Sequence, residues 1–347
     1  MNRIQFAIIG TGAIAGKHAQ AIEATQGAHL KAVWGRNPGV GSAFASQTGA
    51  EFVSDYDRLL EDSAIDAVTI ATPSGSHAEL AIPFLKKGKA VFCEKPLDVT
   101  TEKVDRMLRA AGDYGTILAA VLQLRLGAGA RTLKEAVRSG RFGQIALAGA
   151  YLKWWRDQDY YDSVSWRGTT ELDGGGALMN QGIHGVDLLQ WLVGMPFRLS
   201  AFQSLSAHER IDVEDTIAVN LEFSHGGLGV IEASTAAYPG TAMRIEICGS
   251  DGSAVLEDDR IVRWDFRDER PEDRDIKKSG GGIVGGASDP NAIGFEGHRI
   301  LIEDLVSAIK EQRSPRIPGT EARNAVHLIE AAYASARSGQ VVSMNLS

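Results

Sequence analysis

The chain has 347 residues, 44% of them hydrophobic, and a formal net charge of −8. This composition predicts a globular protein of about two domains, and it excludes a largely disordered chain. The acidic charge argues against a broad electrostatic surface for nucleic acid or an anionic membrane.

Three further absences limit the class of protein. No run approaches the roughly 18 consecutive apolar residues of a membrane span, and the apolar run at the N-terminus is too short for a signal peptide. Two cysteines, Cys93 and Cys248, are too few for a disulfide framework or a four-cysteine zinc site. We therefore predict a cytoplasmic protein with no metal site.

The first third of the chain alternates short apolar runs with helical patterns. We predict strands at 6–9, 30–34, 67–71, 90–93 and 117–121, and helices near 16–25, 41–48, 77–87 and 101–114. Runs that are apolar throughout are typical of parallel strands covered on both faces. The alternation predicts an α/β fold, with a Rossmann-type doubly wound parallel sheet at the N-terminus.

The pattern changes after about Gln123. The segments TIAVNLEF at 216–223 and MRIEIC at 243–248 alternate apolar and polar residues, which predicts strands of a mostly antiparallel sheet. Helical patterns follow at 296–312 and 320–338, after a charged, glycine-rich stretch at 257–288 whose second half we predict to be an exposed loop. We expect a dinucleotide-binding domain over 1–123 and a substrate-binding domain over 124–347. The helices within 296–338 are candidates for packing back on the first domain. The sequence does not indicate a function for the glycine-rich loop 279–287.

The segment GTGAIA at 10–15 directly follows the first predicted strand. It has the G-x-G-x-x-G/A spacing, in which Gly10 permits a tight turn, Gly12 lets backbone N–H groups approach a pyrophosphate, and Ala15 allows close helix packing. An ordinary strand-to-helix turn is the alternative, but the position before the first helix favours a dinucleotide. The predicted cofactor contacts from this turn are Gly10, Thr11, Gly12, Ala13 and Ile14.

The end of the second strand bears on the choice between NAD and NADP. NAD-binding folds commonly have a carboxylate there for the ribose hydroxyls, whereas this chain has AVWGRNP at 32–38. Arg36 could pair with the 2′-phosphate of NADP, or it could be a solvated loop residue. The sequence therefore favours NADP over NAD, with Arg36 as a candidate contact.

Polar residues also follow the strand at 67–71. Ligands of open parallel sheets bind beyond the carboxyl ends of the strands, so Thr72, Pro73 and Ser74 are predicted cofactor contacts. His77 is a further candidate, although capping or packing of the next helix is the preferred interpretation.

A Glu-Lys-Pro tripeptide follows the strand at 90–93. Lys and Glu are seldom buried without a partner, so Glu94 and Lys95 are candidate cofactor contacts, and Pro96 is a candidate for a cis peptide bond. A plain surface turn is the alternative.

The densest group of aromatic and polar residues lies at 151–184. Aromatic faces beside cations suit a sugar-like polyol or an anionic ligand, and an aromatic packing cluster is the alternative. The glycines at 174–176 are expected to let a ligand approach. Asn180 and His184 are spaced i, i+4 and would share one helix face. Asp187 is a candidate to orient His184, and a surface or capping role is the alternative for it. The predicted substrate contacts are Lys153, Arg156, Tyr161, Trp166, Arg167, Asn180 and His184.

Five segments together resemble the Gfo/Idh/MocA family, the glucose–fructose oxidoreductase and inositol dehydrogenase group. They are GTGAIAGKHA at 10–19, TPSGSHAE at 72–79, EKPL at 94–97, GGGALMNQGIHGVDLLQWLVG at 174–194 and GHRILIEDLVSAIKEQRSPRIPG at 297–319. The resemblance implies a Rossmann domain followed by an α/β domain whose large open sheet pairs subunits into homodimers or homotetramers. It also implies hydride transfer between NAD or NADP and a carbinol or carbonyl carbon of a sugar, sugar derivative or cyclitol.

The resemblance also assigns roles at three positions. Lys95 matches the family's catalytic lysine and His184 its catalytic histidine. The family often has Asp where this chain has Asn180, whose amide forms hydrogen bonds but is no base. The resemblance therefore assigns general acid–base catalysis to His184 and Lys95.

Two other functions stay open on the sequence. A glycosidase that uses a bound cofactor for transient oxidation and elimination would release sugar without net NADH or NADPH. A non-catalytic nucleotide-dependent regulator would bind the cofactor without reducing any carbonyl.

Overall fold

The computed structural model describes residues 3–276 and 294–344, and the chain divides into two compact units. The first unit comprises Met1–Leu122 and Gly294–Arg323, and the second comprises Gln123–Ile293 and Asn324–Ser347. The first stretch of the first unit ends at Leu122, one residue before the boundary that we expected at Gln123. We counted residues 294–323 with the second domain and named the helices within 296–338 as candidates for packing back on the first. Residues 294–323 cluster with the first unit.

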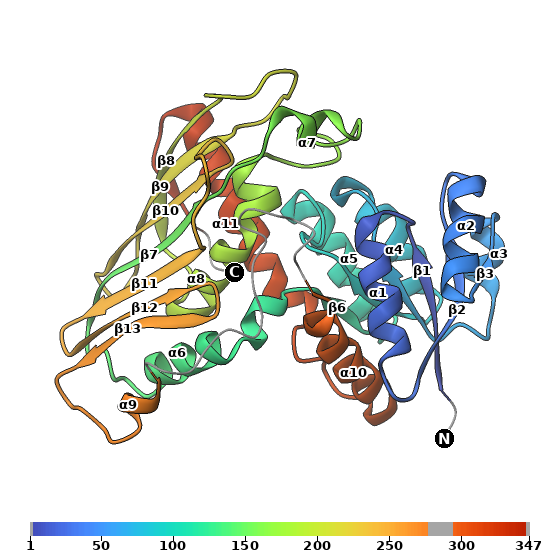
Figure 1. The fold of residues 1–347 in the computed structure, drawn as a ribbon, viewed down its shortest axis with the longest axis horizontal. Coiled ribbons are helices and arrows are strands. Elements are labelled where there is room, and N and C mark those ends of the chain that lie inside the picture. The colour runs from blue at the N-terminus through green and yellow to red at the C-terminus, as the bar shows by residue number, and fades with distance from the viewer. Residues whose placement is uncertain (1–2, 277–293, 345–347) are drawn as a thin grey trace. The chain divides into compact units, whose positions relative to one another are not determined.

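The first unit contains a six-stranded sheet in the order β3-β2-β1-β4-β5-β6. All its strand pairs are parallel, which confirms the predicted doubly wound sheet (Figure 1). The strands are β1 (Ile4–Ile9), β2 (Ala28–Trp34), β3 (Glu51–Phe52), β4 (Ala67–Ile70), β5 (Ala90–Cys93) and β6 (Leu118–Ala120). The helices assigned to this unit are α1 (Ala13–Glu23), α2 (Pro38–Thr48), α3 (Tyr56–Glu61), the 3₁₀ turn η1 (Ser74–Ser76), α4 (His77–Lys86), α5 (Thr101–Asp113) and α10 (Glu296–Glu311).

The strand order of this sheet reverses between β1 and β4. The central strands are apolar because helices cover both of their faces, and Phe6, Ile8, Val68 and Phe92 are fully buried. Crossovers leave β1 and β4 toward opposite edges, and dinucleotides bind beyond the carboxyl ends of such a strand pair in this kind of fold. The GTGAIA turn follows β1, and Thr72 follows β4.

The second unit contains an eight-stranded sheet in the order β13-β12-β11-β7-β10-β9-β8-β14. Only the β7–β10 pair is parallel among the described strands, so the predicted mostly antiparallel sheet is confirmed. The strands are β7 (Ile145–Lys153), β8 (Arg198–Ser204), β9 (Thr216–Glu222), β10 (Leu228–Ser234), β11 (Arg244–Gly249), β12 (Gly252–Glu257), β13 (Arg260–Phe266) and β14 (Val342–Ser343).

The helices of the second unit pack on one face of that sheet, where α8 meets β7 and β11, and α6 meets β12 (Figure 1). They are η2 (Gln123–Leu126), α6 (Ala128–Arg138), α7 (Gln158–Asp162), the π-helical segment η3 (Ala177–Gly182), α8 (Ile183–Val193), α9 (Asp273–Ile276) and most of α11 (Gly319–Ser338). The covered face is apolar, because Ala150, Leu152, Ile231 and Ile245 alternate with residues that point the other way.

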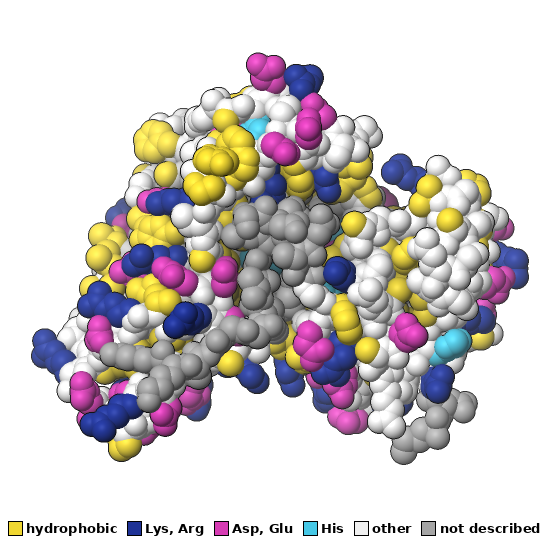
Figure 2. All heavy atoms as spheres, in the orientation of Figure 1, with side chains coloured by type: hydrophobic (Ala, Val, Ile, Leu, Met, Phe, Trp, Pro, Cys, Tyr) yellow, Lys and Arg dark blue, Asp and Glu magenta, His cyan; other side chains and the backbone are white. Residues whose placement is uncertain are grey.

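The charged stretch at 257–288 contains β13 in its first half and α9 at the beginning of the second half, which we predicted to be an exposed loop. The glycine-rich loop 279–287 lies outside the described residues. On the face drawn in Figure 2, Lys and Arg are interspersed with Asp and Glu over the described parts of both units. No helix in the described ranges has the length and hydropathy needed to cross a membrane.

Candidate active site

The GTGAIA turn has the open geometry that a diphosphate needs. Gly10 has φ +119°, and a Cβ there would overlap the carbonyl oxygen of Ala71, so only glycine fits. A Cβ on Gly12 would meet nothing within 4 Å, and Gly12 is the N-cap of α1. No side chain of the described residues caps this helix, and the Ala15 N–H donates to the Gly12 carbonyl at 3.0 Å, so the amides before Ala15 are the ones that can meet an anion. The turn therefore fits the pyrophosphate of a dinucleotide.

The end of β2 lies against this turn, since the Gly10 N–H donates to the Trp34 carbonyl at 2.9 Å. A Cβ on Gly35 would come within 2.8 Å of the Thr11 side chain, so little room exists there for a carboxylate-bearing residue. Arg36 follows as an exposed residue, and the Asn37 side chain caps α2. The structure thus places an exposed cation beside the turn.

The segment after β4 is held mainly by its own hydrogen bonds. The Ser76 hydroxyl donates to Thr72 Oγ1 at 2.9 Å. The buried His77 ring has Nε2 2.8 Å from the Thr72 carbonyl oxygen and Nδ1 2.9 Å from the Pro96 carbonyl oxygen. Because both ring nitrogens face backbone carbonyls, the structure favours the packing interpretation of His77 over a cofactor contact.

The segment after β5 contains the candidate lysine. The Lys95–Pro96 peptide bond is cis, and Lys95 is half-buried. Glu94 is 7% exposed, and its carboxylate accepts hydrogen bonds from His18, His298 and the Lys95 N–H. These contacts occupy both oxygens of Glu94, so the structure favours a role inside the protein over the predicted cofactor contact.

The segment before α8 differs from the α-helix that we expected. Asn180 lies in the π-helical segment η3, and α8 begins at Ile183. The wider π turn changes the i, i+4 relation predicted between Asn180 and His184. The Asn180 amide donates to Asp173, and its oxygen accepts from Gln181 Nε2 at 3.0 Å. His184 is 7% exposed, one residue into α8.

The glycine triplet at 174–176 is explained by packing rather than by a ligand. A Cβ on Gly175 would overlap the Tyr333 hydroxyl, and one on Gly176 would overlap the Glu214 carbonyl oxygen. The Glu214 carboxylate accepts from the N–H groups of Gly176 at 2.9 Å and Leu178 at 2.8 Å. Glu214 therefore caps the π segment, and packing explains Gly175 and Gly176 without the ligand approach that we expected there.

Arg156, Tyr160 and Gln181 form a polar cluster beside Asn180. Arg156 donates to Gln181 Oε1 at 3.1 Å, and Gln181 Nε2 donates to the Tyr160 hydroxyl at 2.8 Å. The guanidinium of Arg167 lies 4.1 Å from the centre of the Tyr160 ring. Of the predicted substrate contacts, the structure thus brings Arg156, Arg167 and Asn180 together.

Other predicted substrate contacts are placed elsewhere in the second unit. Tyr161 is buried, with its hydroxyl 2.8 Å from Thr235 Oγ1, and burial raises the pKa of this phenol. Lys153 lies on the sheet face that α8 does not cover, where it pairs with Glu232 at 2.7 Å. Trp166 is half-buried beside Arg167, with the guanidinium 5.6 Å from its ring.

Asp187, which we considered as an orienting group for His184, pairs with the buried Arg125. Its two oxygens accept hydrogen bonds from Arg125 at 2.8 and 2.6 Å, and Gln190 donates to one of them at 3.2 Å.

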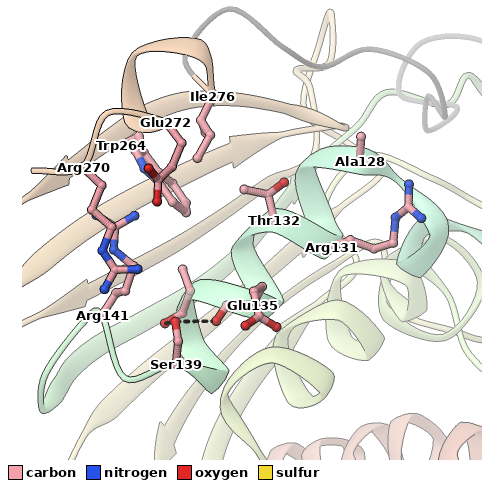
Figure 3. A pocket seen from close by; sticks show the side chains of 11 residues that line it. Ala128, Arg131, Thr132, Glu135, Ser139, Arg141, Trp264, Arg270, Glu272 and Ile276 are labelled. Carbon is pink, nitrogen blue, oxygen red and sulfur yellow. Dashed lines mark hydrogen bonds between the residues drawn. The ribbon is translucent and has the colours of Figure 1, made fainter.

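A hollow of about 500 Å³ lies between α6 and the segment from β13 to α9 in the second unit (Figure 3). Side chains of both charge signs surround it, and no predicted site residue lines it. Its lining is Ala128, Arg131, Thr132, Glu135, Ala136, Ser139, Arg141, Trp264, Arg270, Glu272 and Ile276. We assign it no role in the reaction.

Sequence reasoning missed two groups of residues. His18 and His298 follow the apolar spacing of α1 and α10, which was a signal that each is buried but not that they meet. Tyr160 and Gln181 lie next to predicted contacts, and Asp173 precedes the glycine triplet. Only the fold shows which of these neighbours face one another.

Comparisons with known proteins agree with this geometry. Residues 4–121 match the model of the oxidoreductase family with an NAD-binding Rossmann fold, and residues 130–255 match the GFO/IDH/MocA C-terminal domain. The chain is similar to inositol 2-dehydrogenase of Rhizobium meliloti, with 30% identity over 75% of this chain and 77% of the relative. It is also similar to 2,7-anhydro-N-acetylneuraminate hydratase of Mediterraneibacter gnavus, with 27% identity over 79% of this chain and 75% of the relative.

A solved structure is similar over the whole chain. The WlbA dehydrogenase of Chromobacterium violaceum, in complex with NADH and UDP-GlcNAcA, has a TM-score of 0.91 and 32% identity, covering 100% of this chain and 97% of that one. The two matched domain models, these relatives and the open glycine turn after β1 agree, and the chain belongs to the Gfo/Idh/MocA family of NAD-binding oxidoreductases.

Proposed function

We propose that this protein is an NAD(P)-dependent dehydrogenase that oxidises, or in reverse forms, a hydroxyl of a sugar, sugar derivative or cyclitol. The observation that carries the proposal is the N-terminus of α1, which begins within the GTGAIA segment and has no side-chain cap among the described residues. The chain also matches the model of the NAD-binding oxidoreductase family. The named relatives support the substrate class, since they include an inositol dehydrogenase and a dehydrogenase in complex with a nucleotide sugar.

The cofactor would be held by main-chain and small side-chain groups of the first unit. Residues 10–14 would bind its diphosphate, and Thr72, Pro73 and Ser74 would line it beyond β4. When bound, the nicotinamide supplies the site that accepts or donates the hydride.

Three residues would act on the substrate hydroxyl. The Lys95 ammonium would stabilise the negative charge that develops on the oxygen. His184 would accept the proton, since a neutral imidazole has one ring nitrogen that accepts and histidine is the side chain that most often acts as a general base. Asn180, held by Asp173 and Gln181, would form a hydrogen bond to a neighbouring hydroxyl.

The remaining substrate contacts would come from the polar cluster beside Asn180. We keep Arg156, Arg167 and Trp166 in this role, because they lie in or next to that cluster. We leave out Lys153, on the opposite sheet face, and Tyr161, whose hydroxyl is bonded within the protein.

We propose a preference for NADP over NAD, supported by the exposed Arg36 after β2 and by the lack of a carboxylate there. A solved relative binds NADH, so the preference is one of degree. The ratio of the dissociation constants for NADPH and NADH, measured by nucleotide fluorescence, tests it.

The decisive experiment first screens sugars, sugar nucleotides and cyclitols with NAD and NADP, and then tests Lys95→Ala on the best substrate. We expect Lys95→Ala to lower kcat about 10²-fold or more, while the dissociation constant of the cofactor stays within about twofold. Lys87→Ala, at an exposed lysine of the same unit, is the control and should match the wild type. An unchanged kcat in Lys95→Ala would remove this lysine from the reaction.

The similarity to a hydratase supports one alternative function, in which the cofactor oxidises the substrate only transiently. An enzyme that oxidises transiently and then eliminates or adds water would form product from the same panel, retain its cofactor and show no net NADH or NADPH. Measuring product and reduced cofactor in the same reaction separates the two functions. A regulator would bind cofactor and turn over no member of the panel.

We also propose that the protein is a homodimer or homotetramer in the cytoplasm. The uncovered face of the eight-stranded sheet exposes large apolar side chains, with Leu147 56%, Phe202 75% and Leu228 52% exposed. A second copy of the same sheet would cover them. Both cysteines are free thiols, which suits a reducing compartment.

A further inference from the structure

Three side chains that are distant in sequence meet at the carboxyl end of β5, within the first unit. His18 lies on α1, Glu94 follows β5, and His298 lies on α10. The Nε2 atoms of His18 and His298 are 2.9 and 2.8 Å from the same oxygen, Oε1 of Glu94. All three residues are buried, with exposures of 0%, 7% and 1%.

Each imidazole donates its Nε2–H to Glu94, because an ionised carboxylate only accepts hydrogen bonds. Burial lowers the pKa of His18 and favours a neutral ring. Burial alone would raise the pKa of Glu94, but the hydrogen bonds from His18 and His298 outweigh it and hold this pKa well below its usual value. The cluster is therefore an ionised carboxylate between two imidazole donors.

Two histidines and a carboxylate are also a common set of metal ligands. A histidine that binds a metal almost always donates its second ring N–H to an acceptor. In the described part of the chain, neither Nδ1 of His18 nor Nδ1 of His298 has a hydrogen-bond partner. The contacts therefore favour direct hydrogen bonds to Glu94 over a bound metal ion.

The second oxygen of Glu94 connects this cluster to the reaction. Its Oε2 accepts the backbone N–H of Lys95 at 3.1 Å, and the Glu94 N–H donates to the Ile70 carbonyl at 3.0 Å. One carboxylate thus links α1 and α10 to the main chain of Lys95. In the proposed function, Lys95 stabilises the alkoxide that develops on the substrate.

We propose that His18, Glu94 and His298 are positioning residues that fix the main chain of Lys95 for catalysis. The inference rests on the proposed function of Lys95. Displacing a catalytic group by about 1 Å can cost about 10²-fold in rate, so a loosened Glu94 would lower kcat without touching the cofactor.

The test removes one imidazole and then restores its donor. His298→Leu takes the Nε2–H away from Glu94, whereas His298→Gln places an amide N–H at a similar distance from the main chain. We expect His298→Leu to lower kcat about 10- to 100-fold with KM and cofactor affinity within about twofold, and His298→Gln to keep most of the activity. His29→Leu, at an exposed histidine of β2 in the same unit, is the control.

A double-mutant cycle shows whether His298 acts through Lys95. In a Lys95→Ala background, His298→Leu should cause little further loss, because the group that it positions is already absent. A wild-type kcat in His298→Leu would overturn the inference, as would a full additional loss in the Lys95→Ala background. If Lys95→Ala alone keeps the wild-type kcat, the proposed function of the lysine fails instead, and the two failures are thereby distinguished.

Two further measurements keep the test decisive. If His298→Leu does not fold, Glu94→Gln replaces it, because a carboxamide has one acceptor oxygen and cannot accept both from the histidines and from Lys95. The same loss of kcat is expected with cofactor binding retained, and an unchanged kcat would contradict the inference. Stoichiometric zinc or iron in the purified protein, lost in Glu94→Gln, would show a metal site in place of the network.

Discussion

Gly10 and Gly12 lie in one turn but are glycine for different reasons. Gly10 has φ +119° and no room for a Cβ beside Ala71, so the fold requires it. Gly12 has φ −78°, which any residue adopts, and open space where a Cβ would lie. The second glycine is therefore explained by what approaches the turn from outside.

The two glycines give a paired prediction. Gly10→Ala should lower the free energy of unfolding by about 2 kcal/mol or more, through backbone strain and overlap with Ala71. Gly12→Ala should leave stability within about 0.5 kcal/mol but weaken NADH or NADPH binding at least tenfold, because its methyl group would occupy the space for the diphosphate. Urea unfolding and fluorescence titration measure the two effects. Full cofactor affinity in Gly12→Ala would contradict the placement of the diphosphate at this turn.

At the level of elements, continuous apolar runs predicted the strands of the first sheet to within about two residues, because those strands are buried on both faces. Strand β3 has two residues and helix α3 has six, too short for either periodicity to appear. The π segment before α8 was not predictable, since Glu214, distant in sequence, caps it. Lys153 was proposed from its chemistry alone, and its alternation with the buried Leu152 places it on the sheet face that α8 does not cover.

The short helix α9 is held to β13 by one carboxylate. Asp273 accepts from Arg141 at 2.7 and 2.8 Å and from Trp264 Nε1 at 2.7 Å. The hydrogen bonds from Arg141, the largest cause, hold the pKa of Asp273 far below its usual value. The pKa of an aspartate in an unfolded chain is near 3.9. The stabilisation is therefore complete above about pH 5, and it is lost as the pH falls below about 3.9 toward the folded value.

We expect Asp273→Asn to lower the free energy of unfolding by about 2 kcal/mol at pH 7. The difference from the wild type should shrink as the pH is lowered from about 5 to about 3, since the wild-type carboxylate then becomes protonated in the unfolded state. Urea unfolding followed by tryptophan fluorescence measures both. Asp268→Asn, at an exposed carboxylate nearby, is the control. A difference that is the same at pH 7 and pH 3 would show that charge is not the cause.

At the scale of the whole molecule, the eight-stranded sheet has one face covered by helices and one face on which no helix of the described ranges packs. Phe202 on β8 and Leu228 on β10 belong to the uncovered face, where they alternate with the buried residues of the same strands. The sequence predicted this architecture through the strict alternation in β9 and β11. It did not show which apolar residues point outward, because that depends on the register of each strand.

Phe202→Glu should convert the proposed oligomer into smaller species, because a carboxylate buried in an apolar interface has no partner there. We expect the dissociation constant of the oligomer to rise at least tenfold and cofactor binding to stay unchanged. Light scattering with size-exclusion chromatography measures the mass. Tyr114→Glu places the same charge on another exposed apolar residue, in the first unit, and should leave the mass unchanged. A wild-type protein that is monomeric at micromolar concentration would contradict the proposal.

The first unit is built from two separated stretches of chain, Met1–Leu122 and Gly294–Arg323. On a ribosome that adds about 5–20 residues per second, the sheet is therefore synthesised well before α10. Until α10 arrives, the carboxylate of Glu94 lacks the donor from His298. A fragment that ends near residue 122 would lack this donor permanently. An isolated cofactor-binding domain should therefore be designed with 294–323 joined to it through a flexible linker.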